Sequence, residues 1–115
     1  MRRGEVWLAN LEPHFGAGPG KTRPVLIVQS QTLLDAAYSS SLIVPLTTQR
    51  IDAAEPLRIR VSASGRLRHN SDLLIAQLRA IDNRRLVKGP LLTLGRPQMA
   101  HVDQAIQEVL GLLAE

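Results

Sequence analysis

The sequence predicts a mainly β fold with α, in which a small barrel or a strongly bent sheet carries one packed helix at its C-terminal end. Short runs rich in valine, isoleucine and leucine recur along the chain, and segments rich in glycine, proline and other turn-forming residues separate them. Only the C-terminal segment shows a clear helical period. The chain has 115 residues, enough for one hydrophobic core, so we expect a single domain over residues 1–115.

Five apolar runs are expected to form strands. They cover residues 4–11, 24–29, 41–48, 57–61 and 72–81. Pro45 lies inside the third run, and because proline cannot donate to a ladder, it favours an edge position or a bulge. In the fourth run Arg58 and Arg60 alternate with apolar residues and should lie on the solvent face. A bulge near Gln77 is expected to divide the last run.

Three segments are expected to be helical. Residues 30–38 form a short helix for which Ser30 is a suitable N-cap, and residues 82–86 (DNRRL) form a helical turn. The clearest helix begins near Pro97, which suits a first turn. Its apolar face consists of Val102, Ile106, Val109, Leu110 and Leu113.

The charge of the chain favours an anionic partner. Fourteen basic residues against ten acidic ones give a formal net charge of +4, and twelve of the fourteen are arginine. Arginine offers a planar fork that pairs with phosphate and stacks on bases. The composition therefore favours a nucleic acid or an acidic protein as partner, while a basic surface that serves only solubility remains the alternative.

Several classes of site are excluded by what the sequence lacks. It has no cysteine, so neither a disulfide framework nor a cysteine-based zinc site is possible. Its three histidines, His14, His69 and His101, lack the spacing of a metal site. No apolar run reaches the length of a membrane span, and the N-terminal MRRGEVWL lacks the apolar stretch of a signal peptide. We expect a cytoplasmic protein with no membrane partner.

The glycine-rich stretch at residues 16–24 (GAGPGKTRP) superficially resembles a phosphate-binding P-loop. A P-loop needs two glycines five positions apart before Lys and Ser or Thr, and the position five before Gly20 is Phe15. A helix should also follow, whereas residues 24–29 have the pattern of a strand. The stretch therefore does not predict a nucleotide site.

Polar residues recur at expected strand ends and loop mouths. An arginine beside threonine hydroxyls at such a junction can hold a phosphodiester, because the guanidinium neutralises charge and a hydroxyl donates to an oxygen. Threonine is also a favoured strand residue, and pattern alone favours this structural interpretation. The residues concerned are Arg23, Thr47, Thr48, Ser71, Gln77 and Arg79.

Four segments, in order, resemble the MazF/PemK family of toxin endoribonucleases (mRNA interferases), and together they span essentially the whole chain. They are RRGEVWLANLEP at the start, TRPVLIVQ at 22–29, IVPLTTQ at 43–49 and NSDLLIAQLRAID at 70–82. The resemblance implies an SH3-like barrel of the PemK/MazF/CcdB type with a C-terminal helix. It also implies a homodimer that binds single-stranded RNA in grooves along its interface, and a cognate antitoxin with a flexible acidic segment.

The implied reaction is cleavage of single-stranded mRNA at short sequences without a metal or another cofactor. The ribose 2′-OH attacks the adjacent phosphate and leaves a 2′,3′-cyclic phosphate and a 5′-OH. Because the substrate supplies its own nucleophile, the protein needs only a base, an acid and a cation.

The resemblance assigns roles residue by residue. Arg23 matches the family's catalytic arginine and Thr47 its catalytic threonine, while Arg79 and Asp82 belong to the strand that supports the site. Residues 16–24 match a mobile loop that can cover the site, and its glycines permit movement. The residues expected to contact RNA are Lys21, Thr48, Gln49, Arg66, Arg68, Ser71, Gln77 and Arg79.

Two departures from the family pattern concern the general base. Many members carry a glutamate in the first loop, where this chain has Gly18, and an acid before the glutamine of the QxRxID run, where it has Ala76. His14 in the same loop is a candidate substitute, since imidazole suits proton transfer near neutral pH, although a lone loop histidine is more often incidental. We therefore expect a weakened nuclease, whether Ala76 is natural or replaces an acid to weaken a toxic enzyme.

Two other functions fit the same fold. One is a catalytically silent module that binds RNA or the antitoxin, and the other is a toxin that poisons gyrase by protein contact. Arg23 and Thr47 argue against the gyrase poison, which has no need of them.

Overall fold

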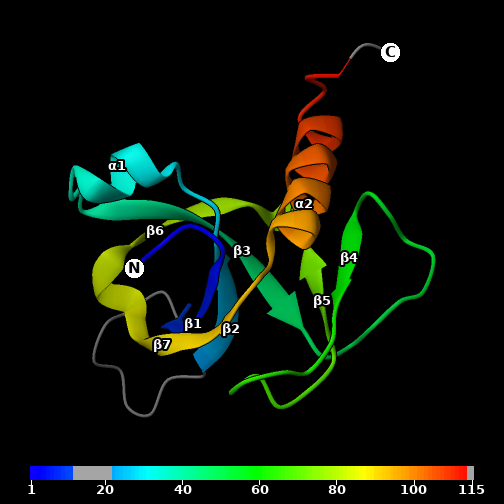
Figure 1. The fold of residues 1–115 in the computed structure, drawn as a ribbon, viewed down its shortest axis with the longest axis horizontal. Helices are drawn as coiled ribbons and strands as arrows, with labels where there is room; N and C mark the ends of the chain where they lie inside the picture. Colours follow the sequence, from blue (N-terminus) through cyan, green and yellow to red (C-terminus); the bar gives the residue numbers. More distant parts are fainter. Residues whose placement is uncertain (12–21, 114–115) are drawn as a thin grey trace.

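The computed structural model describes residues 1–11 and 22–113. Its strands and helices are arranged as a bent antiparallel sheet with the longer helix beside it (Figure 1). The strands are β1 (Glu5–Asn10), β2 (Thr22–Ile27), β3 (Ser40–Thr47), β4 (Arg58–Val61), β5 (Ser71–Leu74), β6 (Arg79–Asp82) and β7 (Leu86–Thr93). The helices are α1 (Gln31–Asp35) and α2 (Arg96–Val109), with short 3-10 turns η1 (Ile75–Gln77) and η2 (Asn83–Arg85). The expected mainly β class with a C-terminal helix is confirmed.

The sheet is strongly bent and is not closed into a barrel. Its strand order is β4-β5-β3-β2-β1-β7, and β6 pairs with β3 off this path. The backbone N–H of Arg66, in the loop that follows β4, donates to the carbonyl of Leu91 in β7 at 2.7 Å. Gly65 makes this approach possible, because a Cβ there would lie 2.8 Å from that same carbonyl oxygen. The loop that follows β4 is thus joined to β7 by a backbone hydrogen bond.

β3 is the central strand, so the expectation of an edge position for Pro45 is wrong. Residues Ser40–Ile43 pair with β6, whereas Leu46 and Thr47 pair with β5. Pro45 lies between these two sets of pairs and is itself opposite Val25 of β2. The missing N–H therefore falls where β3 changes from one neighbour to the next.

The run at 72–81 is divided as predicted, by the 3-10 turn η1 between β5 and β6. The predicted turn at 82–86 is also confirmed as η2. No element was expected where β7 forms, and this strand contains Gly89 and Pro90. Gly89 is required there by packing, since a Cβ would lie 2.3 Å from the Trp7 ring.

α2 begins as predicted, with proline in its first turn. It buries Met99, Val102 and Ala105 against the main core cluster. Leu110, expected on this face, caps the helix and is 54% exposed. Asp103 of α2 also accepts from the Arg3 guanidinium at 2.6 Å, which ties the helix to the N-terminal segment.

The short helix is smaller than the expected 30–38. α1 covers Gln31–Asp35, and Ser30 occupies its N-cap position without a side-chain capping bond. The helix buries none of its residues. In the described part of the chain, no helix has the length and apolar character needed to cross a membrane.

Candidate functional site

A row of polar residues crosses the sheet near the first residues of β2. The β2–β3 register pairs Val25 with Pro45, so its continuation by two residues brings Arg23 opposite Thr47. Because strand side chains alternate, these two point to the same face of the sheet. On the other side of Thr47, β5 places Asp72 opposite it, and β4 places Arg60 opposite Asp72. Residues far apart in sequence thus form one line.

Arg23 and Thr47 line a common cavity of about 300 Å³. Thr48 and Ser71 line the same cavity. The Arg23 side chain is exposed, which leaves its guanidinium accessible to an anion. The Thr47 Oγ1 accepts from the backbone N–H of Gln49 at 3.1 Å. Because this bond uses a lone pair of the hydroxyl oxygen, the hydroxyl hydrogen can donate to a ligand in the cavity.

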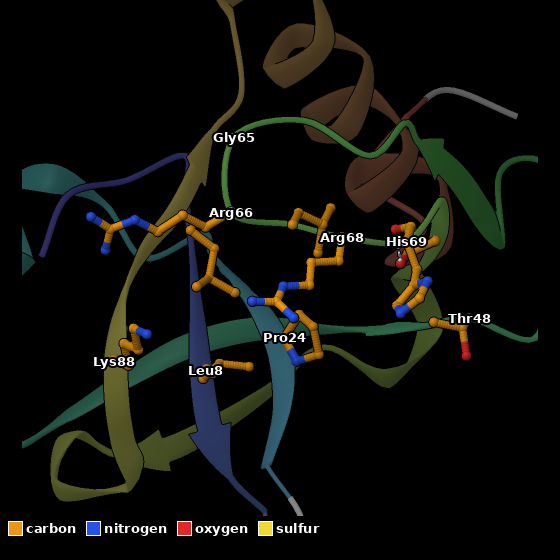
Figure 2. Close-up of a pocket in the computed structure, with 11 residues that line it drawn as sticks. Leu8, Pro24, Thr48, Gly65, Arg66, Arg68, His69 and Lys88 are labelled. Atoms are coloured by element: carbon orange, nitrogen blue, oxygen red, sulfur yellow. Dashed lines mark hydrogen bonds between the residues drawn. The ribbon is translucent and has the colours of Figure 1, made fainter.

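Two further cavities adjoin the first through shared residues, and we call the three together the basic groove. The larger, of about 520 Å³, shares Pro24, Thr48 and Ser71 with the first cavity. The other shares Thr48 with both. Figure 2 shows Arg68 extending toward Pro24, with the His69 ring beside Thr48. The cations lining the basic groove are Arg23, Arg50, Arg66, Arg68 and Lys88.

No aspartate or glutamate is among the described residues that line the basic groove. Five cations and a threonine hydroxyl along a continuous surface suit a polyanion, because each phosphate can meet a guanidinium or ammonium. Within the described ranges, no three histidine, aspartate or glutamate side chains gather as metal ligands.

Ser71 lines the basic groove but has a structural task. It is 1% exposed, and its hydroxyl donates to the carbonyl of His69 at 2.9 Å. This bond fixes the end of the loop that carries Arg66 and Arg68. Asn70 strengthens the same loop, because its side-chain oxygen accepts from the backbone N–H of Ala63 at 2.7 Å.

Asp72 lies behind the groove and is 1% exposed. Burial raises the pKa of its carboxyl, but the hydrogen bonds from Arg60, from the backbone of Ile51 and from Arg58 outweigh burial and hold that pKa below its usual range. The Arg60 Nε–Asp72 Oδ1 distance is 2.6 Å. The carboxylate is therefore a paired anion that lies behind the groove and does not line it.

The structure does not bring every predicted residue to the basic groove. Gln77 and Ala76 lie in η1 and Arg79 in β6, all exposed and outside the three cavities. Ala76 follows the opposite end of β5 from Ser71, so a strand of roughly 10 Å separates them within one chain. Gln49 contributes its backbone to the site but its side chain lines none of the cavities.

Several predictions lie outside the described residues. They are His14, Lys21, Gly18 and the glycine-rich part of the 16–24 loop. Arg66 and Arg68, by contrast, which were expected to contact RNA, both line the groove.

Sequence reasoning missed three groove residues and the carboxylate behind them. Arg50 directly follows the IVPLTTQ segment, His69 directly follows Arg68, and Lys88 belongs to β7, which was not predicted. A signal for Asp72 was present, since Arg58 and Arg60 alternate on one face of their strand and require an acceptor if they are not fully solvated.

Comparison with known proteins places the chain in a family. The model of the family described as PemK-like, MazF-like toxin of type II toxin-antitoxin system matches residues 2–110. The chain is also 40% identical over 114 residues to Endoribonuclease MazF of Staphylococcus saprophyticus, a match that covers 97% of this chain and 92% of that protein.

Solved structures share the fold. The Mycobacterium tuberculosis toxin MazF-mt6 superposes with a TM-score of 0.76 at 21% identity, covering 96% of this chain and 99% of that chain. An endoribonuclease in complex with its cognate antitoxin, from a mycobacterial species, gives a TM-score of 0.74 at 22% identity, covering 100% and 99%. The fold expected from the sequence is confirmed by these similarities. Because the family model spans nearly the whole chain, the chain belongs to the PemK-like, MazF-like toxins of type II toxin-antitoxin systems.

Proposed function

We propose that this chain is the endoribonuclease toxin of a toxin-antitoxin system and cleaves single-stranded mRNA at short specific sequences without a metal ion. The observation that carries the proposal is the position of Arg23 and Thr47, which share a cavity at one end of a groove lined by cations. The name of the Staphylococcus saprophyticus relative supports the activity. Because the proposed substrate is mRNA, we expect the protein to act in the cytoplasm.

Arg23 and Thr47 hold the scissile phosphate in this proposal. The substrate 2′-OH loses its proton and attacks the phosphorus, and the bond to the 5′-oxygen breaks. That oxygen takes a proton from solvent, which leaves a 2′,3′-cyclic phosphate and a 5′-OH. The Arg23 guanidinium stabilises the negative charge that develops on the phosphorane. The Thr47 hydroxyl, oriented by the Gln49 N–H, donates to a phosphate oxygen. The other groove cations bind the flanking phosphates.

The proton of the 2′-OH requires an acceptor, and two histidines are the candidates. His14 was identified from the sequence, and His69 lines the basic groove directly. Imidazole is suited to this transfer near neutral pH. His14→Gln and His69→Gln separate them: the variant that lacks the base should lose about 10²-fold or more in rate, while the other retains it.

We further propose that the protein works as a homodimer and that Ala76 weakens it. Because β5 separates Ala76 from its own groove, an acid at this position would serve the groove of the second copy. Light scattering at micromolar concentration should give about twice the 12.6 kDa mass of the monomer. A mass of 12.6 kDa over this range would remove both the dimer and this role for position 76.

The proposed partner that controls the toxin is an antitoxin with an acidic segment. Such a segment pairs its carboxylates with the groove arginines that otherwise meet phosphates, so it competes with RNA. An endoribonuclease of this fold has been solved with its cognate antitoxin, which supports the proposal. An antitoxin complex that binds RNA as tightly as the free toxin would contradict it.

The activity is tested by incubating the purified protein with a long RNA in the presence of EDTA. Discrete fragments with 5′-OH ends, identified by their need for phosphorylation before ligation, are the expected result, and sequencing these ends gives the recognised motif. Arg23→Ala should lose on the order of 10²-fold in rate. Arg23→Lys should recover little, since lysine keeps the charge but loses the fork.

The matched control is Arg96→Ala. Arg96 is exposed at the start of α2 and lines none of the three cavities, so its loss removes the same charge away from the groove. This variant should cleave at the parental rate. If the parent protein binds the RNA but leaves it intact, the result would favour a catalytically silent binding module over a nuclease.

A further inference from the structure

The turn that follows β3 is held by a chain of hydrogen bonds that begins at Thr47. The Thr47 Oγ1 accepts from the N–H of Gln49 at 3.1 Å, and the carbonyl of Gln49 accepts from Nη1 of Arg58 at 2.7 Å. The same Nη1 lies 3.3 Å from Oδ2 of Asp72. That oxygen also accepts from the backbone N–H of Ile51 at 2.9 Å. The Asp72 carboxylate thus holds the turn at two points, at Gln49 through Arg58 and at Ile51 directly.

Of the anchoring pair, Asp72 is buried and Arg58 is half-buried, whereas the turn is exposed. Asp72 is 1% exposed and the Arg58 side chain 21% exposed, while Thr48, Gln49 and Arg50 of the turn are all exposed. A charged hydrogen bond shielded from water is stronger than a solvated one, because water competes with it less. The Asp72–Arg58 pair, which lies beneath the turn, therefore holds the turn in place.

The position of this turn matters to the site. It supplies the N–H that orients the Thr47 hydroxyl, and it carries Thr48 and Arg50, which line the basic groove. We propose that Asp72 and Arg58 are positioning residues, which set the Thr47 hydroxyl and the adjacent turn for catalysis without touching RNA. The catalytic part of this inference rests on the proposed nuclease function. A displacement of about 1 Å in such a site is enough to lower a rate by about 10²-fold.

Arg60 provides a matched comparison within the same network. Like Arg58 it donates to Asp72, with Nε at 2.6 Å from Oδ1. Its other end reaches Asp52 at 2.7 Å rather than the carbonyl of Gln49. Arg58→Met and Arg60→Met therefore each remove one cation from Asp72, but only Arg58→Met removes the hydrogen bond to the carbonyl of Gln49.

The experiment measures both variants in two ways. Hydrogen exchange of the Gln49 and Ile51 amides reports on the turn, and steady-state cleavage of a short RNA reports on catalysis. Arg58→Met should accelerate exchange of both amides and lower kcat by about 10-fold with KM nearly unchanged, because the groove cations that bind RNA remain. Arg60→Met should do neither, even where thermal melting shows that it destabilises the fold equally.

Three outcomes would overturn the inference. Equal loss of kcat in the two variants would mean that Asp72 acts only through charge compensation. Unchanged exchange in Arg58→Met would mean that the turn holds itself. Faster exchange with an unchanged kcat would mean that its position does not matter to catalysis. If the parent protein fails to cleave RNA, the proposed function fails, and the exchange experiment still decides whether Arg58 holds the turn.

Discussion

Gly65→Ala should both destabilise the protein and weaken its RNA cleavage. Gly65 has φ +56°, where an alanine is disfavoured by roughly 1–2 kcal/mol. The added Cβ would also lie 2.8 Å from the carbonyl oxygen of Leu91, inside the 3.4 Å at which ordinary contact begins. Both partners at this contact are backbone, so relief requires the loop to move, and overpacking of this kind costs about 1–3 kcal/mol.

Gly111→Ala is the control that separates these two contributions. Gly111 has φ +73°, but a Cβ added there would meet nothing within 4 Å. This variant therefore carries only the free-energy cost of placing alanine at a positive φ. The difference between the two variants isolates the contact with Leu91. For a chain of 115 residues, about 4 °C in melting temperature corresponds to each kcal/mol, so Gly65→Ala should melt about 4–12 °C below Gly111→Ala.

The assay combines thermal unfolding by circular dichroism with binding and cleavage of a fluorescent RNA. Displacement of the loop moves Arg66 and Arg68, so Gly65→Ala should also bind RNA more weakly at a temperature where it is fully folded. Gly111→Ala should bind as the parent does. Equal melting temperatures for the two variants, or parental RNA affinity in Gly65→Ala, would refute the reasoning that the backbone bond to Leu91 holds the groove.

Three further predictions address the site and its charges. Ala76→Glu should raise the cleavage rate by about 10²–10⁴-fold if an acid there restores a general base, and single-turnover kinetics check this; an unchanged rate would remove the proposed weakening. RNA affinity should fall with salt, with a slope of log K against log salt of up to about −3.5 if all five groove cations meet phosphates, and Arg68→Gln should reduce the slope by about 0.7 in a salt titration. Hydrogen bonds from the Arg84 side chain and backbone lower the pKa of Asp82 from 3.8 to about 2, so its contribution to stability is complete above pH 4 and is lost as the pH falls toward 2. Acid titration of the melting temperature should therefore show a smaller loss in Asp82→Asn than in the parent over that range.

Local pattern was sufficient where local physics determines the structure. The alternation in LRIRV predicted which residues of β4 are buried, and Ile59 and Val61 are at most 2% exposed. Pro97 marked the start of α2, because the first turn of a helix does not need its N–H. The segments that resemble the toxin family predicted a mainly β fold with a C-terminal helix, which the described residues show.

Long-range packing explains what the sequence analysis missed. β7 contains a glycine that a strand would ordinarily avoid, and the reason is the ring of Trp7, which lies far away in sequence. Pro45 suggested an edge strand because nothing local shows that β3 changes partners at that residue. Arg58 and Arg60 were expected simply to face water, but Asp72 on the neighbouring strand binds both.

The positive charge of the molecule is concentrated at the basic groove. The formal net charge is +4, yet the basic groove alone carries five cations, so the remainder of the chain is close to neutral at −1. A polyanion therefore experiences attraction from one side, and the field rotates it toward the groove before contact, within the Debye length of about 8–10 Å. Two anionic chains that approach the same molecule compete for that one face during encounter, so whichever arrives first also weakens the attraction felt by the second.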